Sequence, residues 1–282
     1  NYSRTGGSRA MRVLSIYNMK GGVGKTATAV NLSYLAAAAG HRTLIWDLDP
    51  QGASSFYFRV KPKVKGGSKK IVRGKSDLDD LIKGTDFTNL DILPADFSYR
   101  ELDLQFADSK QSRMKKLIAP LRKEYDLIVF DCPPSISELS QQIFRASDLL
   151  LVPLLPTTLS IRTLEQIQDF LRKERVTKLE LRTFFSMVDR RKKMHREFVE
   201  DFAANSADHL TACVPYSSAV EKMGLERRPF RNRVSPVTSG PAQAGTSKFS
   251  SSEASSISAT TSPLLAPSNT SISQVLPACS TI

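Results

Sequence analysis

A glycine-rich loop stands between an apolar segment and an alanine-rich segment near the start of the chain. Residues 20–26 read KGGVGKT; they follow the apolar run 12–17 (RVLSIY) and lead into the alanine-rich run 25–39. Glycine lets the backbone approach a ligand closely, and the N-terminus of a helix favours negative charge. The order strand, glycine loop, helix therefore predicts a phosphate-binding turn, with an ordinary glycine turn as the alternative.

Individual residues of this loop fit phosphate chemistry. The Lys25 ammonium would neutralise the β- and γ-phosphates of a nucleotide, and the Thr26 hydroxyl would bind Mg²⁺. The usual P-loop pattern has glycine where this chain has Met19, and a second lysine, Lys20, enters the loop here instead. The residues expected to contact the nucleotide are Gly21, Gly22, Val23, Gly24, Lys25, Thr26 and Ala27.

Strand-like and helix-like segments alternate through the body of the chain. The expected strands are 12–17, 43–46, 90–93, 127–130, 149–152, 181–188 and a short 213–214. The expected helices are 25–39, 112–123, 137–146, 161–173 and 195–204. Near-continuous apolar strands separated by helices are typical of a parallel sheet. The sequence therefore predicts an α/β fold, a mostly parallel twisted sheet with helices on both faces.

The two ends of the chain differ in composition from its body. Residues 1–10 are small and polar, and we expect a flexible leader there. Residues 231–282 contain 20 serine and threonine residues, one aromatic residue and no sustained helical or strand period. Such a segment cannot bury enough apolar surface to offset chain entropy, so we expect a disordered tail. One folded domain is predicted between them, over residues 11–230.

The composition narrows the class of protein. The formal net charge of +12 favours an anionic partner such as nucleic acid. The three cysteines are far apart and never form a CxxC pair, which argues against a disulfide scaffold or a zinc finger. The longest apolar stretch, residues 149–156, is under half of the roughly 20 residues that a membrane-spanning helix needs. We therefore expect a cytoplasmic protein without a membrane partner.

Acidic residues follow two further predicted strands. Asp47 and Asp49 belong to the sequence DLDPQG after strand 43–46, and Asp131 opens the sequence DCPP after strand 127–130. In parallel sheets, ligands bind at the carboxyl ends of the strands. Carboxylates at that edge can orient a water or hold the hydration shell of a metal, although DLDPQG alone could be an ordinary acidic turn. Asp131 is the expected water-mediated contact of Mg²⁺.

The three motifs, in this order and spacing, resemble the ParA/MinD family of deviant Walker ATPases. The resemblance covers about residues 11–230, and segments 153–165 and 184–195 look more like the ParA branch. It implies a P-loop ATPase that binds ATP and Mg²⁺ and hydrolyses ATP slowly. It also implies a homodimer that closes around two nucleotides.

The same resemblance implies roles for individual residues. Lys20 matches the family's signature lysine, which reaches the ATP of the partner subunit; comparable trans cations contribute on the order of 10³–10⁵ in rate. Asp49 is the candidate for positioning the attacking water, with Asp47 in a supporting role. Thr26 and Asp131 are the candidate metal residues. Pro215 is a candidate nucleotide contact, because relatives form an adenine-facing loop in that region.

Two clusters of basic residues are candidate binding surfaces. Segment 61–75 carries seven lysine and arginine residues and no acid in a stretch expected to be a mobile loop, and could contact DNA or a cargo adaptor. The second cluster comprises Arg190, Arg191, Lys192, Lys193 and Arg196. Clustered cations bind phosphates without sequence preference, although many charge runs are only solvated surface. ParA-like dimers typically bind DNA nonspecifically, so the resemblance favours double-stranded DNA and association with the nucleoid when ATP is bound.

The favoured hypothesis is an ATPase that partitions or positions DNA or a protein cargo, with an activating adaptor. Three other functions stay open. A MinD-like membrane ATPase would need an apolar helical face near a terminus. A nitrogenase-iron-protein-like carrier of electrons or metal clusters would need suitably placed cysteines. A small-molecule P-loop kinase or ligase would be favoured by dimerisation that does not depend on ATP.

Overall fold

The computed structural model describes residues 11–73, 78–107 and 113–230. The predicted leader (1–10), the predicted tail (231–282) and part of the basic segment 61–75 lie outside the described residues.

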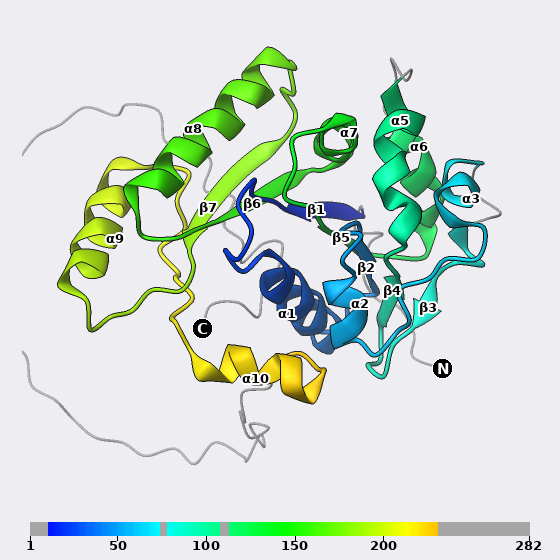
Figure 1. The fold of residues 1–282 in the computed structure, drawn as a ribbon, viewed down its shortest axis with the longest axis horizontal. Helices are drawn as coiled ribbons and strands as arrows, with labels where there is room; N and C mark the ends of the chain where they lie inside the picture. The colour runs from blue at the N-terminus through cyan, green and yellow to red at the C-terminus, as the bar shows by residue number, and fades with distance from the viewer. Residues whose placement is uncertain (1–10, 74–77, 108–112, 231–282) are drawn as a thin grey trace, which may run out of the picture.

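A seven-stranded sheet forms the centre of the described part of the chain (Figure 1). Its strand order is β3-β4-β2-β5-β1-β6-β7, and the neighbouring strands are parallel except for the antiparallel pair β3–β4. The mostly parallel α/β sheet predicted from the sequence is thus confirmed. The strands are β1 (Arg12–Ile16), β2 (Thr43–Asp47), β3 (Lys83–Gly84), β4 (Leu90–Leu93), β5 (Leu127–Asp131), β6 (Leu149–Leu154) and β7 (Glu180–Phe185).

Helices cover both faces of this sheet. In Figure 1, α1 (Lys25–Ala38) and α10 (Ser218–Glu226) lie on one side, and α7 (Glu138–Ala146) and α8 (Thr158–Lys173) lie on the other. Each face of the sheet has its own apolar cluster, because successive residues of a strand point to opposite faces. Leu14 packs in the cluster that contains α1, and Val13 packs in the cluster that contains α7 and α8. The remaining helices are α2 (Ala53–Tyr57), α3 (Gly67–Arg73), α5 (Leu102–Ala107), α6 (Arg113–Ile118) and α9 (Lys193–Asn205), with 3-10 helices η1 (Phe97–Glu101) and η2 (Ala119–Lys123).

Some boundaries differ from the sequence prediction for local reasons. The predicted helix 112–123 divides into α6 and η2 at Pro120, since proline cannot donate the backbone hydrogen bond that would continue the helix. The predicted strand 213–214 is wrong. An isolated bridge joins Val188 to Pro215 instead, next to a hydrogen bond from Val214 N to Phe185 O.

Among the described residues, the α-helices α2, α3, α5 and α10 were absent from the sequence prediction, and α10 and α3 show why. The helix α10 buries Met223 but leaves Leu225 86% exposed, so its sequence has little apolar periodicity. The basic segment 61–75, expected to be a loop, contains α3. Ile71 of α3 is fully buried in the cluster of α7 and α8, which explains why this part of the segment becomes helical.

A partly buried histidine makes the stability of the fold depend on pH. The Nδ1 of His209 lies 2.9 Å from Thr183 Oγ1, and its ring packs against Phe185 and Phe202 with centroid distances of 4.7 and 5.1 Å. Burial lowers the pKa of His209 to about 4. Folding therefore favours the neutral imidazole. This contribution is complete above the unfolded pKa of about 6.5 and is lost as the pH falls toward 4.

We expect the free energy of unfolding to fall between pH 7 and pH 4.5 more steeply in the natural chain than in His209→Gln. The difference in slope is at most about 1.4 kcal/mol per pH unit, the limit for one proton, and smaller because the ring is only half buried. Urea unfolding at a series of pH values measures both slopes. Parallel profiles for the two chains would show that His209 does not titrate on unfolding in this range.

Candidate functional site

The carboxyl ends of β1, β2 and β5 meet at one edge of the sheet. Asp131, the last residue of β5, is paired in register with Ile16 of β1 on one side and with Asp47 of β2 on the other. The glycine loop follows β1 at the same edge. The three motifs that the sequence singled out therefore come together in space, as expected from ligand binding at strand ends.

The glycine loop has a backbone that only glycine accommodates easily. Gly24 immediately precedes α1 and has a left-handed φ of 92°. A Cβ atom at Gly24 would lie 2.9 Å from Ser186 Oγ, so a side chain there would also collide with the residue that follows β7. Val23 is buried and anchors the loop, while Gly21 and Gly22 are exposed. The loop thus presents bare backbone to solvent at the start of a helix, which suits an anion.

Lys25 points back into this loop. Its side chain is buried, and Nζ donates a hydrogen bond to the backbone oxygen of Lys20 at 2.9 Å. Burial lowers the pKa of Lys25, and the negative charges of Asp131 and Asp49 partly oppose that shift. Thr26 and Ala27 follow in the first turn of α1 and are half-buried. An ammonium group held inside the loop is well placed to meet an anion bound there.

Asn18 fixes the start of the loop. This side chain is 1% exposed; Nδ2 donates to Pro153 O of β6 at 2.8 Å, and Oδ1 accepts from Lys20 N at 2.9 Å. The backbone of Lys20 is therefore tied to the end of β6 through Asn18 and to Lys25 through its carbonyl. Lys20 itself is half-buried.

Asp47 and Asp131 are fully buried, and each has one oxygen with a hydrogen-bond partner and one without among the described residues. Ser54 Oγ donates to Asp131 Oδ2 at 2.7 Å, and Ser55 donates to Asp47 Oδ2 from both its Oγ and its backbone nitrogen, each at 2.7 Å. Burial raises the pKa of both carboxyl groups, and their mutual repulsion adds to the rise at Asp47. Ionised, this pair needs a compensating cation.

The donor set at this edge fits Mg²⁺ bound together with a phosphate. Asp131 Oδ1 is buried and lacks a hydrogen-bond partner in the described part of the chain, and the nearby Thr26 side chain partly opposes the rise of the Asp131 pKa that burial causes. Mg²⁺ prefers oxygen ligands and usually combines one or two protein groups with substrate phosphates and water. Within the described residues no group of three or more His, Cys, Asp or Glu side chains forms a metal-binding cluster. The described residues therefore do not form a metal site made of protein ligands alone.

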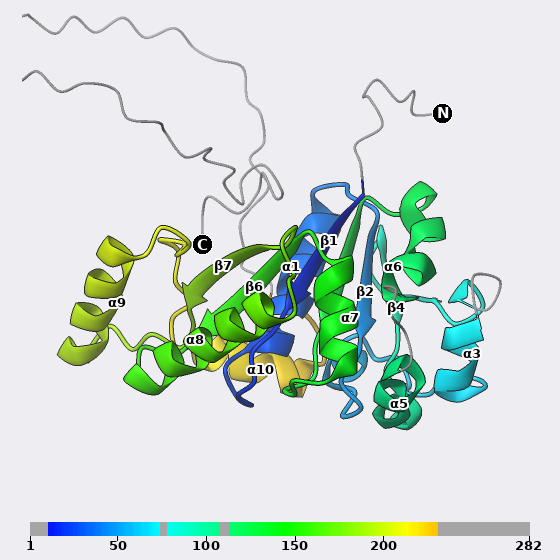
Figure 2. The same cartoon turned by 90° about the horizontal axis from the view of Figure 1, so that it is seen from above.

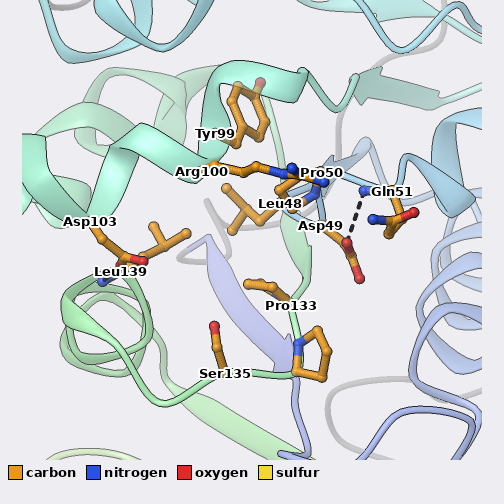
Figure 3. A pocket seen from close by; sticks show the side chains of 11 residues that line it. Leu48, Asp49, Pro50, Gln51, Tyr99, Arg100, Asp103, Pro133, Ser135 and Leu139 are labelled. Atoms are coloured by element: carbon orange, nitrogen blue, oxygen red, sulfur yellow. Dashed lines mark hydrogen bonds between the residues drawn. The ribbon is translucent and has the colours of Figure 1, made fainter.

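Asp49 differs from the other two acids because it faces an open cavity. The cavity has a volume of about 330 Å³ and is lined by Asp49, Gln51, Tyr99, Arg100 and Pro133 among others (Figure 3). Asp49 is half-buried, and its Oδ1 accepts a hydrogen bond from Gln51 N at 2.9 Å. This carboxylate can therefore contact a water, which the two buried acids reach less readily.

Pro215 lies in the segment that follows Val214, whose backbone nitrogen donates to Phe185 O at the end of β7. It is exposed and forms an isolated bridge with Val188. Ser186 and Met187, just before Val188, are the residues that a Cβ at Gly24 would meet. The helix α10 follows directly, and Asn31 of α1 donates to the sulfur of Met223. The segment after Pro215 thus packs on α1 through α10, and the nucleotide contact of Pro215 stays a prediction.

The second basic cluster follows the carboxyl end of β7: Arg190, Arg191 and Lys192 precede α9, and Lys193 and Arg196 lie within it. Arg191 pairs with Asp189, whose pKa is lowered to about 2 by the hydrogen bonds from Arg191. Lys193 pairs with Glu197, and the Arg196 guanidinium donates to Arg190 O. Within the described residues the structure therefore leaves the charges of Arg190, Lys192 and Arg196 without an ion pair, unlike those of Arg191 and Lys193.

Asn18, Ser54 and Ser55 were not predicted from the sequence. Asn18 and Ser54 act through partners far away in the chain, at separations of 135 residues for Asn18 with Pro153 and 77 residues for Ser54 with Asp131, whereas Ser55 binds Asp47 only 8 residues away. Their proximity to KGGVGKT and DLDPQG is the signal that could have marked them. None of the helices in the described ranges has the length and apolar character needed to cross a membrane.

Comparisons with known proteins place the chain in a family. Residues 11–183 match the family described as AAA domain (AAA_31). The chromosome partitioning protein ParA of Caulobacter vibrioides is 30% identical over 222 residues, which span 75% of this chain and 83% of that protein. The sporulation initiation inhibitor protein Soj of Bacillus subtilis is 35% identical over 57% of this chain and 65% of its own length. The Myxococcus xanthus ParA is 36% identical, but the match spans only 52% of it.

Solved structures show the same fold. Cobyrinic acid a,c-diamide synthase from Mycobacterium smegmatis, with bound ATP analogue and magnesium, superposes with a TM-score of 0.67 at 25% identity over 77% of this chain and 91% of that one. The Cyanothece McdA(D38A)–ATP complex has a TM-score of 0.68 at 20% identity over 79% of this chain and 89% of that one. With the sheet, the glycine loop and the strand-end acids, these matches show that the chain belongs to the ParA/MinD family of P-loop ATPases, in its ParA branch.

Proposed function

We propose that this chain is an ATP-switched partition or positioning ATPase. It binds ATP with Mg²⁺, forms a dimer around two nucleotides, binds double-stranded DNA nonspecifically and hydrolyses ATP slowly. The observation that carries the proposal is the edge where the glycine loop meets two buried carboxylates, each with an unpaired oxygen. That arrangement is costly without a cation and suits a metal-bound triphosphate. Residues 11–230 are the proposed working unit.

The nucleotide is held by backbone and by one buried ammonium group. Residues Gly21 to Ala27 present the phosphate-binding backbone, and Lys25 turns from Lys20 O toward the phosphates. Thr26 would hold Mg²⁺ through its hydroxyl, and Asp131 would hold it through the hydration shell of the ion. The bound Mg²⁺ supplies positive charge against the phosphate oxygens. Pro215 contributes a contact at the base of the nucleotide.

Two residues act on the reaction itself. Asp49, which lines the open cavity, orients a water. Asp47 has a supporting role, because its hydrogen bond from Ser55 holds the DLDPQG loop against α2. Lys20 extends to the nucleotide of the partner subunit. Asn18 supports this role because it fixes the Lys20 backbone and leaves the side chain to reach outward. Because that cation comes from another copy, ATP binding and dimerisation become one linked event.

The names of the relatives support a role in partitioning or positioning. Caulobacter and Myxococcus proteins matched by this chain are chromosome partitioning proteins. We infer that this chain carries out the same class of task on DNA or a protein cargo in the cytoplasm, on the nucleoid when ATP is bound. A further protein activates hydrolysis and releases the dimer from DNA.

A second candidate function is ATP-dependent amide synthesis on a small molecule. It is favoured by the likeness to cobyrinic acid a,c-diamide synthase, at 25% identity. Such an enzyme has no need of a cation from a second copy. Dimerisation that is independent of ATP would therefore favour the synthase over the partition ATPase.

Co-sedimentation of the full chain with double-stranded DNA tests the proposal. We expect DNA retention with ATP and Mg²⁺, and much weaker retention with ADP or without nucleotide. Sizing chromatography on the same samples reports dimerisation. A chain that stays monomeric with ATP and ignores DNA in all three states would contradict the proposed function.

Charge reversal on the cluster before α9 should separate DNA binding from nucleotide binding. Changing Arg190, Arg191, Lys192 and Lys193 to Glu should weaken DNA retention at least tenfold at moderate salt, since each lost phosphate contact removes counterion release. Nucleotide affinity should stay unchanged, because these residues belong neither to the glycine loop nor to the strand-end acids. The matched control reverses four cations elsewhere, Lys115, Lys116, Arg122 and Lys123. Equal DNA retention by both variants would remove the α9 cluster from the DNA-binding surface.

A further inference from the structure

Four lysines form an exposed, unneutralised patch beside the segment that follows β4, where Asp96 and Ser98 lie. Lys61, Lys63, Lys65 and Lys69 are exposed, and none forms an ion pair with a residue that the structure describes. We call residues 61–69 the lysine loop. The basic side chains on either side of it do have acidic partners. Arg59 pairs with Asp86, and Lys70 pairs with Asp80. One acid does face the loop: hydrogen bonds from Ser98 and Val64 lower the pKa of Asp96, and the charge of Lys63 adds to that shift.

The lysine loop is fixed to the body of the protein. Val64 is 4% exposed, and its backbone nitrogen donates to Asp96 Oδ2 at 2.7 Å. Ser68 N donates to Ser98 Oγ at 2.7 Å, and a Cβ at Gly52 would lie 2.8 Å from Pro62 Cβ. The loop therefore lies directly on the segment that carries Asp49. Because the backbone is already ordered, binding through these lysines costs little additional chain entropy.

The chemistry of the patch indicates what it binds. Protein–protein interfaces need buried aromatic or large apolar anchors and are depleted in lysine. The loop exposes lysines, Pro62 and Gly66, while its one larger apolar side chain, Val64, is buried. Phosphate groups, by contrast, require only accessible point charges. The absence of aromatic side chains from 61–69 also argues against stacked single strands.

We propose that Lys61, Lys63, Lys65 and Lys69 form a second site for the phosphate backbone of double-stranded nucleic acid. The site is separate from the α9 cluster, since α3 and α9 lie at opposite ends of the sheet in both views (Figure 1, Figure 2). It goes beyond the proposed function, which assigns DNA to Arg190–Lys193 and Arg196. DNA held at both ends of the sheet would contact more phosphates than either cluster reaches alone.

The test compares two variants of the full chain that lose the same charge. The first changes Lys61, Lys63, Lys65 and Lys69 to Gln. The control changes four exposed cations near the end of α8 to Gln, namely Arg172, Lys173, Arg175 and Lys178. The affinity for a labelled DNA duplex is measured with ATP and Mg²⁺ over a range of salt concentrations, beside nucleotide affinity and binding to phosphatidylglycerol vesicles.

We expect the lysine-loop variant to bind the duplex at least ~10-fold more weakly near physiological salt. The slope of log K against log salt should shrink by about 2 to 4, at roughly 0.9 for each phosphate contact. Nucleotide affinity should be unchanged, and the control should keep the slope of the natural chain. Equal losses in both variants, an unchanged slope, or a loss confined to vesicles would overturn the second site.

Failure of this site and failure of the proposed function give different results. If the natural chain binds the duplex with ATP, and only the α9 variant loses affinity, the second site is wrong and the proposed function stands. If the natural chain does not bind duplex in any nucleotide state, both are wrong. If the lysine-loop variant loses affinity while the α9 variant does not, the second site is the main one.

Discussion

Lys25→Ala is expected to lower the affinity for ATP by at least ~100-fold while the chain stays folded. Lys25 is the buried ammonium of the glycine loop, held 2.9 Å from Lys20 O and close to the charges of Asp131 and Asp49. A charge-assisted contact in a site shielded from water is worth far more than one on the surface. Removing it also leaves the carboxylates without their nearest cation. Titration with a fluorescent ATP analogue measures the affinity, and circular dichroism reports the fold.

The matched control is Lys20→Ala, a lysine in the same loop. Its backbone is held by Asn18, and its side chain is half-buried, whereas that of Lys25 is buried. This variant should bind ATP within about threefold of the natural chain, because the loss of a half-exposed charge is modest. It should fail to dimerise with ATP. Equal loss of ATP affinity in both variants would mean that Lys20 serves its own nucleotide rather than that of a partner.

The parts of the site that are contiguous in sequence could be predicted. KGGVGKT between an apolar strand and an alanine-rich helix defines the loop, and Asp131 stands directly at the end of β5. The meeting of Asp47 with Asp131 was not determined by the sequence alone. It depends on β2 lying beside β5, and the alternation of strands and helices does not fix the order of strands in a sheet.

The contacts that hold the site together could not be predicted because they are long-range. Ser54 meets an acid 77 residues away, and Asn18 meets a carbonyl 135 residues away. A serine in a loop usually bonds to its own backbone, so its sequence context favours a local turn. The helix α10 was not predicted for a similar reason. Its sequence has little apolar periodicity, and its burial depends on Met223 packing against α1.

Asp49→Ala should slow hydrolysis by at least ~100-fold and leave ATP affinity within about threefold. A positioned base typically contributes 10²–10⁴ in rate. Of the three acids, Asp49 is the one on the open cavity (Figure 3), while the carboxylates of Asp47 and Asp131 are buried and held by serines. Phosphate release in single turnover measures the rate. With hydrolysis blocked, ATP-bound dimer should accumulate on a sizing column.

Two controls separate the charge of Asp49 from its effect on the loop. Asp49→Asn retains an oxygen that can accept from Gln51 N, so it keeps the loop while removing the charge. It should be as slow as Asp49→Ala if the carboxylate orients water. Asp103→Asn changes another acid of the same cavity, one whose Oδ1 accepts from Leu139 N, and should hydrolyse ATP normally. Normal turnover by Asp49→Asn together with slow turnover by Asp49→Ala would assign Asp49 to loop shape, and the water would then be oriented by another group.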